Sequence, residues 1–387
     1  MPASSLNELG TPAEWRILLE CASARPDAPR LAGLLRKTDW AFLLELAEEH
    51  GVLNLVAART REFDETVVPA ESRALLIERQ RAYALSALSL IAEMIRILER
   101  FGEAGIPALV LKGPALSLQA YGDATARQYG DVDLLMRQRD IYRVTELMTL
   151  AGFHADVPLA AVAADRIPGE YLFSRTNTKV IVEVHTEKTL RYFPNSLAIE
   201  ELFERHVTLE FDGHDLPTLS NEDALVSACT HGAKHCWERL MWIADVAAML
   251  NRQTSMNWEE VARIAENLGA RRIVNTGLLL VAELLHAPVP ASVEEKARAD
   301  RWARKLVGRI QTWLPTAGEA SPGLLRRALF RSQMRGGFLP GIGYLTRLLL
   351  SPTEEDWRAG HEHKGSRILE TGRRLVRLAG KYGRDSN

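Results

Sequence analysis

Two carboxylates lie two residues apart in an apolar stretch, at Asp131 and Asp133 in Gln-Tyr-Gly-Asp-Val-Asp-Leu-Leu-Met, residues 128–136. Side chains alternate along a β-strand, so both acids are expected on one face. Like charges on a half-buried strand raise each other's pKa, and burial adds to that penalty. A divalent cation removes the conflict, and carboxylate oxygens are natural ligands of Mg²⁺. The pair therefore predicts a metal site of the kind that assists phosphoryl chemistry.

A third carboxylate is predicted on the strand expected near residues 179–185, which ends in Val-Ile-Val-Glu-Val-His. Alternation puts the valines on one face and Glu183 with His185 on the other. Asp131, Asp133 and Glu183 are therefore expected to be the catalytic, metal-binding residues, with Mg²⁺ or Mn²⁺ as the cofactor. Three carboxylates on neighbouring strands can hold one or two such ions for attack of an acceptor hydroxyl on the α-phosphorus of a nucleoside triphosphate.

Two residues near Glu183 leave alternatives open. Glu187 could serve in place of Glu183 as the third acid. His185 shares the face of Glu183 and is predicted to contact the nucleotide, while the alternative is a hydrogen-bonded structural histidine at a strand end.

Positive charge is expected close to the acids. Lys112 follows an apolar strand predicted over residues 108–111, where one cation could meet the phosphates, and Gly113 lets a backbone approach closely. Arg127 is either an ordinary loop arginine or a bidentate phosphate clamp. Lys112, Gly113 and Arg127 are therefore predicted as nucleotide-binding residues.

A second group of chemically active residues lies on a long helix expected to reach about residue 250. His231 and His235, four residues apart, share one helix face. Zinc is disfavoured, because Cys236 is turned by about 100° from His235 on a helix and the sequence lacks the His-Glu-x-x-His pattern. Two interpretations stay open: packing of this face, or a surface that closes over a nucleotide, where His231, Lys234, His235 or Arg239 meets its phosphate or base. His235 and Arg239 are predicted as nucleotide-binding residues.

Four neighbours of these histidines have predicted structural roles. Trp237, Trp242 and Ile243 are expected in the core rather than as base-stacking platforms. Asp245 is expected to be the buried partner of an ion pair.

The elements that position these residues follow from local patterns. Apolar residues at helical spacing predict helices throughout residues 12–100, including a long one over 71–104. A mixed segment follows, and Ser220 is expected to cap the helix that reaches residue 250. The predicted elements of the mixed segment are strands 108–111, 131–136, 171–174, 179–185 and 207–211, helices 115–122, 140–151 and 198–205, and a loop over 154–170.

This order predicts an α+β fold, in which a core with a mixed sheet is embedded in a mostly helical chain. Four regions are expected: an N-terminal helical region, the α/β core, a C-terminal helical region and a polar, basic tail. Their expected boundaries are 1–104, 105–215, 216–350 and 351–387.

Composition excludes several classes of function. The 387 residues are 47% hydrophobic and 25% charged, with a formal net charge of −2, so no global charge attracts nucleic acid or anionic membranes. Arginines do cluster near residues 326–335 and 373–384, where a solvated helix face is favoured over an RNA or acidic-partner surface. The sequence also lacks a dinucleotide-binding glycine motif, a Walker A sequence and a Gly-x-Ser-x-Gly elbow.

The expected location is the cytoplasm. Three cysteines without a C-x-x-C pair fit a reducing compartment rather than a disulfide framework. The N-terminus has no secretory signal pattern, and no apolar run is long enough for a membrane span.

Taken together, these motifs resemble the uncharacterised nucleotidyltransferase family of the DNA-polymerase-β-like nucleotidyltransferase superfamily. The resemblance covers residues 12 to about 250 and rests on Leu-Val-Leu-Lys-Gly-Pro-Ala-Leu, Gly-Asp-Val-Asp-Leu-Leu-Met, Leu-Met-Thr-Leu-Ala-Gly-Phe and Val-Ile-Val-Glu-Val-His. It implies a minimal nucleotidyltransferase-like fold, which is a short mixed sheet with helices on one side. It also implies that Asp131 and Asp133 are metal ligands and Glu183 is the third acid.

One difference from the superfamily concerns the triphosphate. The superfamily usually has Gly-Ser before the acids, where serine and backbone grip the phosphates. This chain has Lys112-Gly113-Pro114, and its nearest serine is Ser117. A lysine would have to replace that grip electrostatically.

The sequence therefore favours a metal-dependent nucleotidyltransferase that moves a nucleoside monophosphate from an NTP to an unknown acceptor. The resemblance favours a small molecule or peptide of a biosynthetic pathway as that acceptor. Two alternatives stay open: a non-catalytic nucleotide-binding or scaffold protein on a degenerate fold, and a toxin-type enzyme acting on tRNA or protein. Nucleic acid is a less favoured partner, and no membrane partner is expected.

Overall fold

The structure is a computed structural model that describes residues 12–163, 169–175, 180–187, 198–316, 324–335 and 341. The basic segment at 373–384 lies outside these residues. In the described part, no helix is long and apolar enough to cross a membrane.

A mixed seven-stranded sheet forms the centre of the fold, in the order β3-β4-β5-β2-β1-β7-β6. The strands are β1 (Leu109–Val110), β2 (Val132–Leu135), β3 (His154–Ala155), β4 (Glu170–Arg175), β5 (Val180–His185), β6 (Val207–Phe211) and β7 (His214–Thr218). β2 is parallel to β5 and β1 is parallel to β7, whereas the other neighbours are antiparallel. Because the rest of the described chain is mostly helical, the predicted α+β class is confirmed.

The helices, in chain order, are α1 (Ala13–Ala22), α2 (Ala28–Leu35), α3 (Trp40–Glu49), α4 (Leu53–Thr60), α5 (Ala70–Glu103), α6 (Pro114–Tyr121), α7 (Ile141–Leu150), α8 (Leu159–Ala163), α9 (Ile199–Glu204), α10 (Asn221–Lys234), α11 (Leu240–Arg252), α12 (Trp258–Asn267), α13 (Arg271–Leu285), α14 (Ala291–Ala299), α15 (Arg301–Trp313) and α16 (Leu324–Gln333). Two 3₁₀ segments lie at Gln138–Asp140 and Leu314–Thr316.

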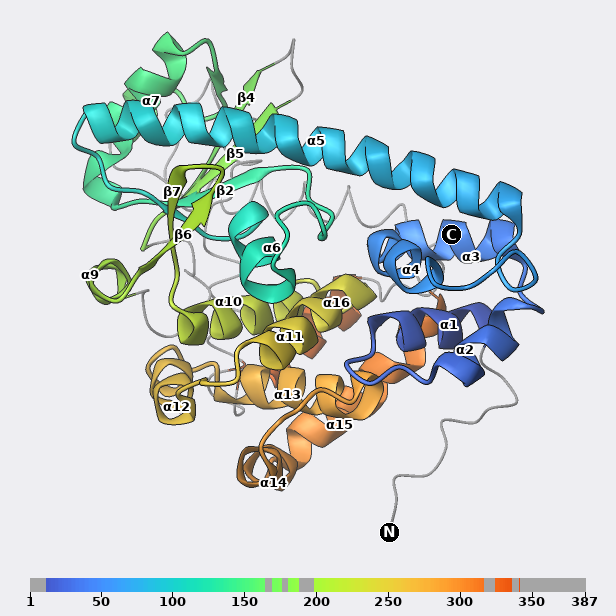
Figure 1. Cartoon of the computed structure of the whole chain (residues 1–387). Helices are drawn as coiled ribbons and strands as arrows, with labels where there is room; N and C mark the ends of the chain where they lie inside the picture. The colour runs from blue at the N-terminus through green and yellow to red at the C-terminus, as the bar shows by residue number, and fades with distance from the viewer. Residues whose placement is uncertain are drawn as a thin grey trace.

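The long helix predicted over residues 71–104 is α5, which runs along one whole side of the molecule (Figure 1). Its C-terminal half packs Met94 and Phe101 against the sheet, in a cluster that also contains Val144 of α7 and Val182 of β5. Residues three and four apart on α5 therefore present a continuous apolar stripe to this face. α5 and α7 together seal one side of the sheet.

The opposite face of the sheet contributes to a second, larger core. Leu109 of β1 and Leu135 of β2 join Leu116 of α6 and Leu225 of α10 in one cluster. Helices therefore cover both faces, unlike the one-sided arrangement that the family resemblance implies. The polar residues of β2 and β5 lie on this second face.

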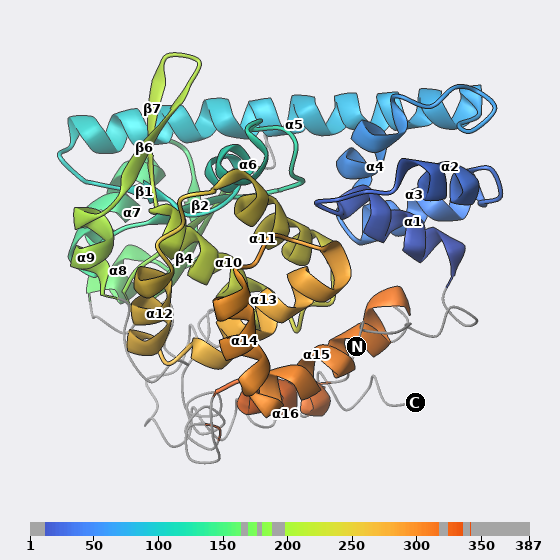
Figure 2. The same cartoon turned by 60° about the horizontal axis from the view of Figure 1, so that its bottom comes forward.

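The larger core also joins the N-terminal helices to the C-terminal ones. Leu18 of α1 and Leu43 of α3 belong to the same buried cluster as Leu280 of α13 and Leu306 of α15. Figures 1 and 2 show α1–α4 beside these later helices, below α5. The predicted division into regions at residues 104, 215 and 350 stays a prediction.

The single helix expected to reach residue 250 is wrong, because the chain forms two helices, α10 and α11, with a break between them. Ser220 does cap the first of them, accepting a hydrogen bond from the Asp223 amide at 3.2 Å. α10 ends at His235 in a Schellman motif, in which the Trp237 amide donates to the Gly232 carbonyl at 2.8 Å and the Cys236 amide to that of Ala233.

The break needs two residues with left-handed backbone, at Cys236 (φ 55°) and Trp237 (φ 56°). A helix end of this type usually carries glycine at that position, so no local sequence signal predicts this break. The Trp237 ring is fully buried and lies directly over Gly232, where any Cβ would come within 2.5 Å of the ring. Tertiary packing of one indole thus stabilises a turn that local propensity does not favour.

Two smaller elements also differ from the predictions. β7 was not expected, because it contains Pro217 and proline lacks the amide donor of a strand. The segment 154–170, expected to be a loop, contains β3 and α8. β7 lies between β1 and β6, so it completes the sheet beside the predicted site strands.

His50 joins the N-terminal helices to the start of α11. Its Nδ1 accepts a hydrogen bond from the Leu240 amide at 3.2 Å, and its carbonyl accepts one from Met241 at 3.1 Å. Burial, and secondarily the charge of Arg239, lowers the pKa of His50 to about 4. Nδ1 can accept only while the ring is neutral, so protonation of His50 opposes folding.

Stability is therefore expected to decrease as the pH falls from 6.5 towards 4, because the unfolded chain binds a proton that the folded chain excludes. The contribution of one such group is about 1.4 kcal/mol per pH unit in this window. In His50→Asn the amide oxygen can accept from Leu240 and does not titrate. Urea unfolding between pH 7 and pH 4.5 should give that variant a shallower decline, and an unchanged slope would contradict the assignment.

Candidate active site

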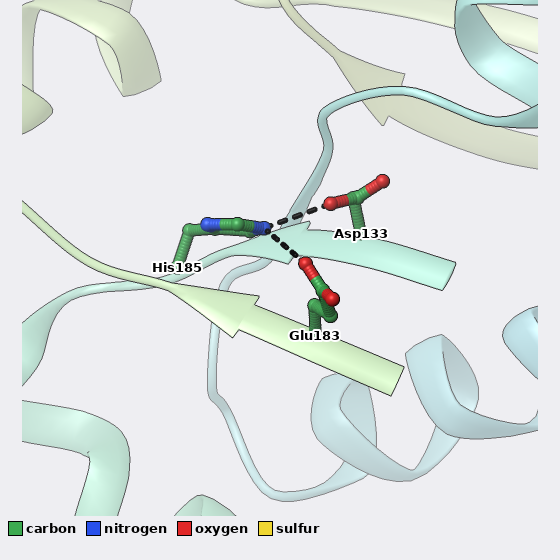
Figure 3. A group of neighbouring side chains, drawn as sticks. All are labelled: Asp133, Glu183 and His185. Atoms are coloured by element: carbon green, nitrogen blue, oxygen red, sulfur yellow. Dashed lines mark hydrogen bonds and ion pairs between the residues drawn. The ribbon is translucent and has the colours of Figure 1, made fainter. Parts of the chain in front are cut away.

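Three ionisable side chains meet on the second face of the sheet, at neighbouring positions of β2 and β5. The parallel register aligns Asp133 with Glu183, and Leu135 with His185. Nε2 of His185 lies 2.8 Å from Oδ1 of Asp133 and 3.6 Å from Oε2 of Glu183 (Figure 3). One ligand atom from each side chain lies within 4.8 Å of the others. The three atoms are therefore close enough to bind the same metal ion.

Strand alternation places these groups as the sequence predicts for β5. Val180, Val182 and Val184 are buried in the core under α5, while Glu183 and His185 occupy the opposite face. On β2 the same alternation buries Val132 and turns the Asp133 carboxylate to the site. Glu183, rather than Glu187, lies in the group, because the Glu187 carboxylate accepts a hydrogen bond from the Gln138 amide at 2.9 Å.

Asp131 lies at the bend just before β2 and is partly buried. Burial, and then the charge of Asp133, raises the pKa of Asp131. The pKa of Glu183 is raised in the same way, first by burial and then by Asp133. Asp131 is thus close enough to Asp133 for the two charges to interact. The role of Asp131 as a metal ligand stays a prediction.

Asp133 is the ionised centre of the group. Burial alone would raise its pKa, but Lys112 and His185 outweigh burial and hold the pKa of Asp133 far below its usual range. The Lys112 ammonium donates to Oδ1 of Asp133 at 2.8 Å. Burial works against the charge of Lys112 as well, but Asp133 raises the pKa of Lys112 above its ordinary value. Lys112 thus brings a permanent positive charge to the acids.

Gly113 forms the turn between β1 and α6, as the residue before the first helical position. Its φ of 56° and ψ of −122° belong to a region that only glycine enters easily. Pro114 follows at the first helical position, where its missing amide costs nothing. This geometry aims the backbone turn at Asp131, whose carbonyl oxygen would lie 3.6 Å from a Cβ at Gly113.

Ser117 does not take the place of the superfamily serine. It is fully buried, and its hydroxyl donates to the Asp123 carbonyl at 2.6 Å. The same oxygen accepts a hydrogen bond from the Arg127 amide at 3.1 Å. Ser117 therefore fastens the loop before the acids to α6 and does not face a phosphate site.

Arg127 is buried in an ion pair. Its Nε donates to Oδ2 of Asp245 at 2.7 Å, and the Tyr121 hydroxyl donates to Oδ1 at 3.0 Å. The expectation that Asp245 is a buried ion-pair partner is confirmed. Arg127 also lines the pocket described below, and its contact with a nucleotide stays a prediction.

The end of α10 faces the acids from the helical side. The rings of His231 and His235 lie 4.7 Å apart, and that of His235 stacks on Trp242 with centroids 4.9 Å apart. Burial is the main cause that lowers the pKa of both histidines, to about 3 for His235, so both rings are neutral near pH 7. Ile243 and Trp237 are fully buried, as predicted, whereas Trp242 is only partly buried.

The zinc interpretation of these histidines gains no support. In the ranges that the structure describes, the one group able to hold a metal is Asp133, Glu183 and His185. Cys236 is buried below the turn after α10. Arg239 is exposed at the residue before α11, and nucleotide binding by His235 and Arg239 stays a prediction.

A pocket connects the two sides of the site. Its lining includes Lys112 and Arg127 from the sheet side and Ser227, His231, Trp242 and Asp245 from α10 and α11. Lys112 contacts both this pocket and Asp133.

Sequence reasoning missed Glu170 as a contributor to the site. Glu170 pairs in register with His185 from β4, and its Oε1 lies 3.9 Å from the His185 Nδ1. The Lys234 ammonium lies 3.6 Å from the same oxygen. Glu170 is the last residue of the stretch expected to be a loop, so nothing local indicated its place beside His185.

Comparisons with known proteins identify the family of this chain. The sequence matches the family described as "Uncharacterised nucleotidyltransferase" over residues 36–286. No curated protein matches significantly. Among solved structures, the chain is similar to an antigenic nucleotidyltransferase-like protein from Paracoccidioides brasiliensis, with 17% identity and a TM-score of 0.32 over 52% of this chain and 94% of that one, a likeness too weak to carry further inference. Because the matched range exceeds half of the chain and contains every residue of the site, the chain belongs to the uncharacterised nucleotidyltransferase family.

Proposed function

We propose that this chain is a metal-dependent nucleotidyltransferase that moves a nucleoside monophosphate from an NTP to an acceptor, releasing pyrophosphate. The observation that carries the proposal is the alignment of Asp133 with Glu183 on adjacent parallel strands, on the face opposite the core valines. Burying acids together is unfavourable without a cation, so such an arrangement favours a metal-binding role.

The donor set fits a divalent ion. Two carboxylates and an imidazole present ligand atoms within 4.8 Å of one another, and Asp131 adds a further carboxylate just before β2. A bound Mg²⁺ or Mn²⁺ supplies charge neutralisation at the phosphates and orientation of the triphosphate. Asp131, Asp133 and Glu183 would hold it.

The chain's own groups would act around that ion. Lys112 lies just after β1 and contacts Asp133. Its ammonium would turn partly from Asp133 to the bound triphosphate, where it would neutralise the charge that develops on the phosphates. Glu183, whose pKa burial raises, would take the proton of the acceptor hydroxyl. Gly113 would let the phosphates approach the turn before α6.

The acceptor in this proposal is a small molecule or a peptide. The proposed location of the protein is the cytoplasm. All three cysteines are free and buried, which fits a reducing compartment. ATP is one candidate donor in this proposal. The toxin-type alternative rests on the basic C-terminal region, residues 326–335 and 373–384, of which 373–384 lies outside the described residues.

A non-catalytic nucleotide-binding role is the second candidate, and one observation favours it. Lys112 already neutralises Asp133 at 2.8 Å, and Ser117 is turned away from the site. A protein that only senses nucleotide could use Lys112 in place of a metal. Such a protein would bind NTP equally well without a divalent ion.

Calorimetric titration separates the two. Non-hydrolysable analogues of ATP, GTP, CTP and UTP are titrated with and without Mg²⁺ or Mn²⁺, into wild type, Glu183→Gln and the control Glu78→Gln, which is exposed on α5. We expect binding of at least one analogue that requires the ion and is lost in Glu183→Gln but kept in Glu78→Gln. Binding that is equally strong with and without the ion supports the non-catalytic nucleotide-binding role. Absence of binding for every analogue contradicts both candidate functions.

A further inference from the structure

His185 is buried within the acidic group, and only one of its two ring nitrogens has a hydrogen-bond partner in the described part of the chain. A purely structural role for the histidine does not explain this arrangement. Its side chain is 5% exposed, so the ring cannot turn out into solvent. Nε2 faces Asp133 at 2.8 Å and Glu183 at 3.6 Å, whereas Nδ1 is buried without a hydrogen-bond partner among the described residues. A buried polar atom without a partner costs about 1–3 kcal/mol.

The carboxylate of Glu170 lies just beyond that nitrogen. Its Oε1 is 3.9 Å from Nδ1, and the register of β4 and β5 holds the two residues side by side. While Nε2 carries the ring proton to donate to Asp133, Nδ1 has no proton and faces a carboxylate oxygen. That arrangement satisfies one nitrogen and leaves the other opposite an acceptor.

Metal ligation through Nε2 would resolve both problems. The proton then resides on Nδ1, which becomes a donor to Glu170. Histidines that ligate metals almost always donate their other ring N–H to a carboxylate, carbonyl or water, and this outer partner fixes the tautomer. The order Glu170, His185, cation, Asp133 has this form.

Ligand spacing agrees with this arrangement. Donors bound about 2.1 Å from one ion lie about 3 Å apart when adjacent in an octahedral shell. Nε2 of His185 is 2.8 Å and 3.6 Å from the Asp133 and Glu183 oxygens, so only small shifts are needed.

We propose that His185 is a metal ligand, oriented by Glu170, and that the resulting carboxylate–imidazole site takes a transition-metal ion such as Mn²⁺ in preference to Mg²⁺. Mg²⁺ favours all-oxygen shells and retains its water, whereas imidazole is a good ligand for first-row transition ions. The proposal rests on the metal site of the proposed function, and it replaces the nucleotide contact predicted for His185.

The test uses Mn²⁺ itself as the probe, on the full chain labelled with ¹⁵N-histidine. Electron spin echo envelope modulation of bound Mn²⁺ is expected to contain the coupling of a directly ligated nitrogen. His185→Asn should lose that coupling and weaken Mn²⁺ binding by at least about tenfold while changing Mg²⁺ binding little. The strand histidine variant His154→Asn, exposed on β3, should keep both.

Glu170→Gln provides a second variant that keeps His185 in place. We expect it to weaken Mn²⁺ binding by about tenfold without removing the nitrogen coupling, because the orienting partner changes and the ligand does not. Bound Mn²⁺ without nitrogen coupling, or no Mn²⁺ binding by wild type, overturns the proposal. Bound Mn²⁺ with the nitrogen coupling, but without binding of any NTP analogue, would contradict the proposed function and leave the His185 site standing. Bound Mn²⁺ without that coupling would do the reverse.

Discussion

Replacing Asp133 with asparagine is expected to abolish metal-dependent nucleotide binding while leaving the chain folded. Asp133 is in contact with both Lys112 and His185 at 2.8 Å and aligned with Glu183. Asparagine preserves the shape of the side chain but removes the charge that a divalent ion requires. Loss of about 4 kcal/mol of metal-dependent interaction corresponds to about a thousandfold.

Calorimetry with Mn²⁺ and the best non-hydrolysable NTP analogue measures this effect. The matched control is Asp212→Asn, at the exposed turn between β6 and β7, where φ is 50° and asparagine is readily accepted. Circular dichroism of both variants separates loss of binding from loss of fold. Wild-type affinity of Asp133→Asn for the metal–nucleotide complex would remove Asp133 from the site.

The second large effect is expected at Asp245, through stability rather than through the metal. The Arg127 and Asp245 side chains are 7% and 3% exposed, and Tyr121 completes the buried network. Asp245→Asn leaves the Arg127 guanidinium buried without its counter-charge. Breaking a buried ion pair on one side costs about 3–5 kcal/mol.

Urea unfolding measures that loss, with Glu266→Gln as the control. Glu266 pairs with Arg271 at the surface, where the side chains are 64% and 73% exposed, so its loss is expected to cost at most about 1 kcal/mol. The double variant Arg127→Leu/Asp245→Leu should recover much of the stability, because no unpaired charge remains. Equal effects of Asp245→Asn and Glu266→Gln would contradict a structural role for the buried pair.

The pair also explains how the helical region influences the acids. Arg127 lies four residues before Asp131, and Ser117 holds the Arg127 amide against α6. Asp245, on α11, therefore fixes the loop that leads into β2. We infer that α11 sets the position of the acidic strand without itself touching a metal.

The face on which Asp133 and Glu183 lie could be predicted from the sequence, because the alternation of side chains along a strand is a local property. The valines of residues 180–184 and the apolar neighbours of Asp133 determine which side chains face away from the core. The two acids therefore needed only adjacent strands to meet. The register that aligns Asp133 with Glu183 could not be read from either strand alone.

The features that could not be predicted from the sequence depend on contacts between residues far apart in the chain. The turn at Cys236 and Trp237 has no glycine, and it forms because the indole of Trp237 packs over Gly232. The partner of Arg127 lies 118 residues along the chain. Glu170 becomes part of the site only through its pairing with His185 on the next strand. Each of these depends on tertiary packing that overrides or extends local propensity.

The most direct test of the central claim is a crystal structure with Mn²⁺ and a non-hydrolysable NTP analogue, with anomalous scattering recorded near the manganese edge. The proposal predicts an anomalous peak within bonding distance of the Asp133 and Glu183 carboxylates, with the triphosphate reaching Lys112. Nucleotide bound with no manganese at these acids, or with manganese elsewhere, would contradict it.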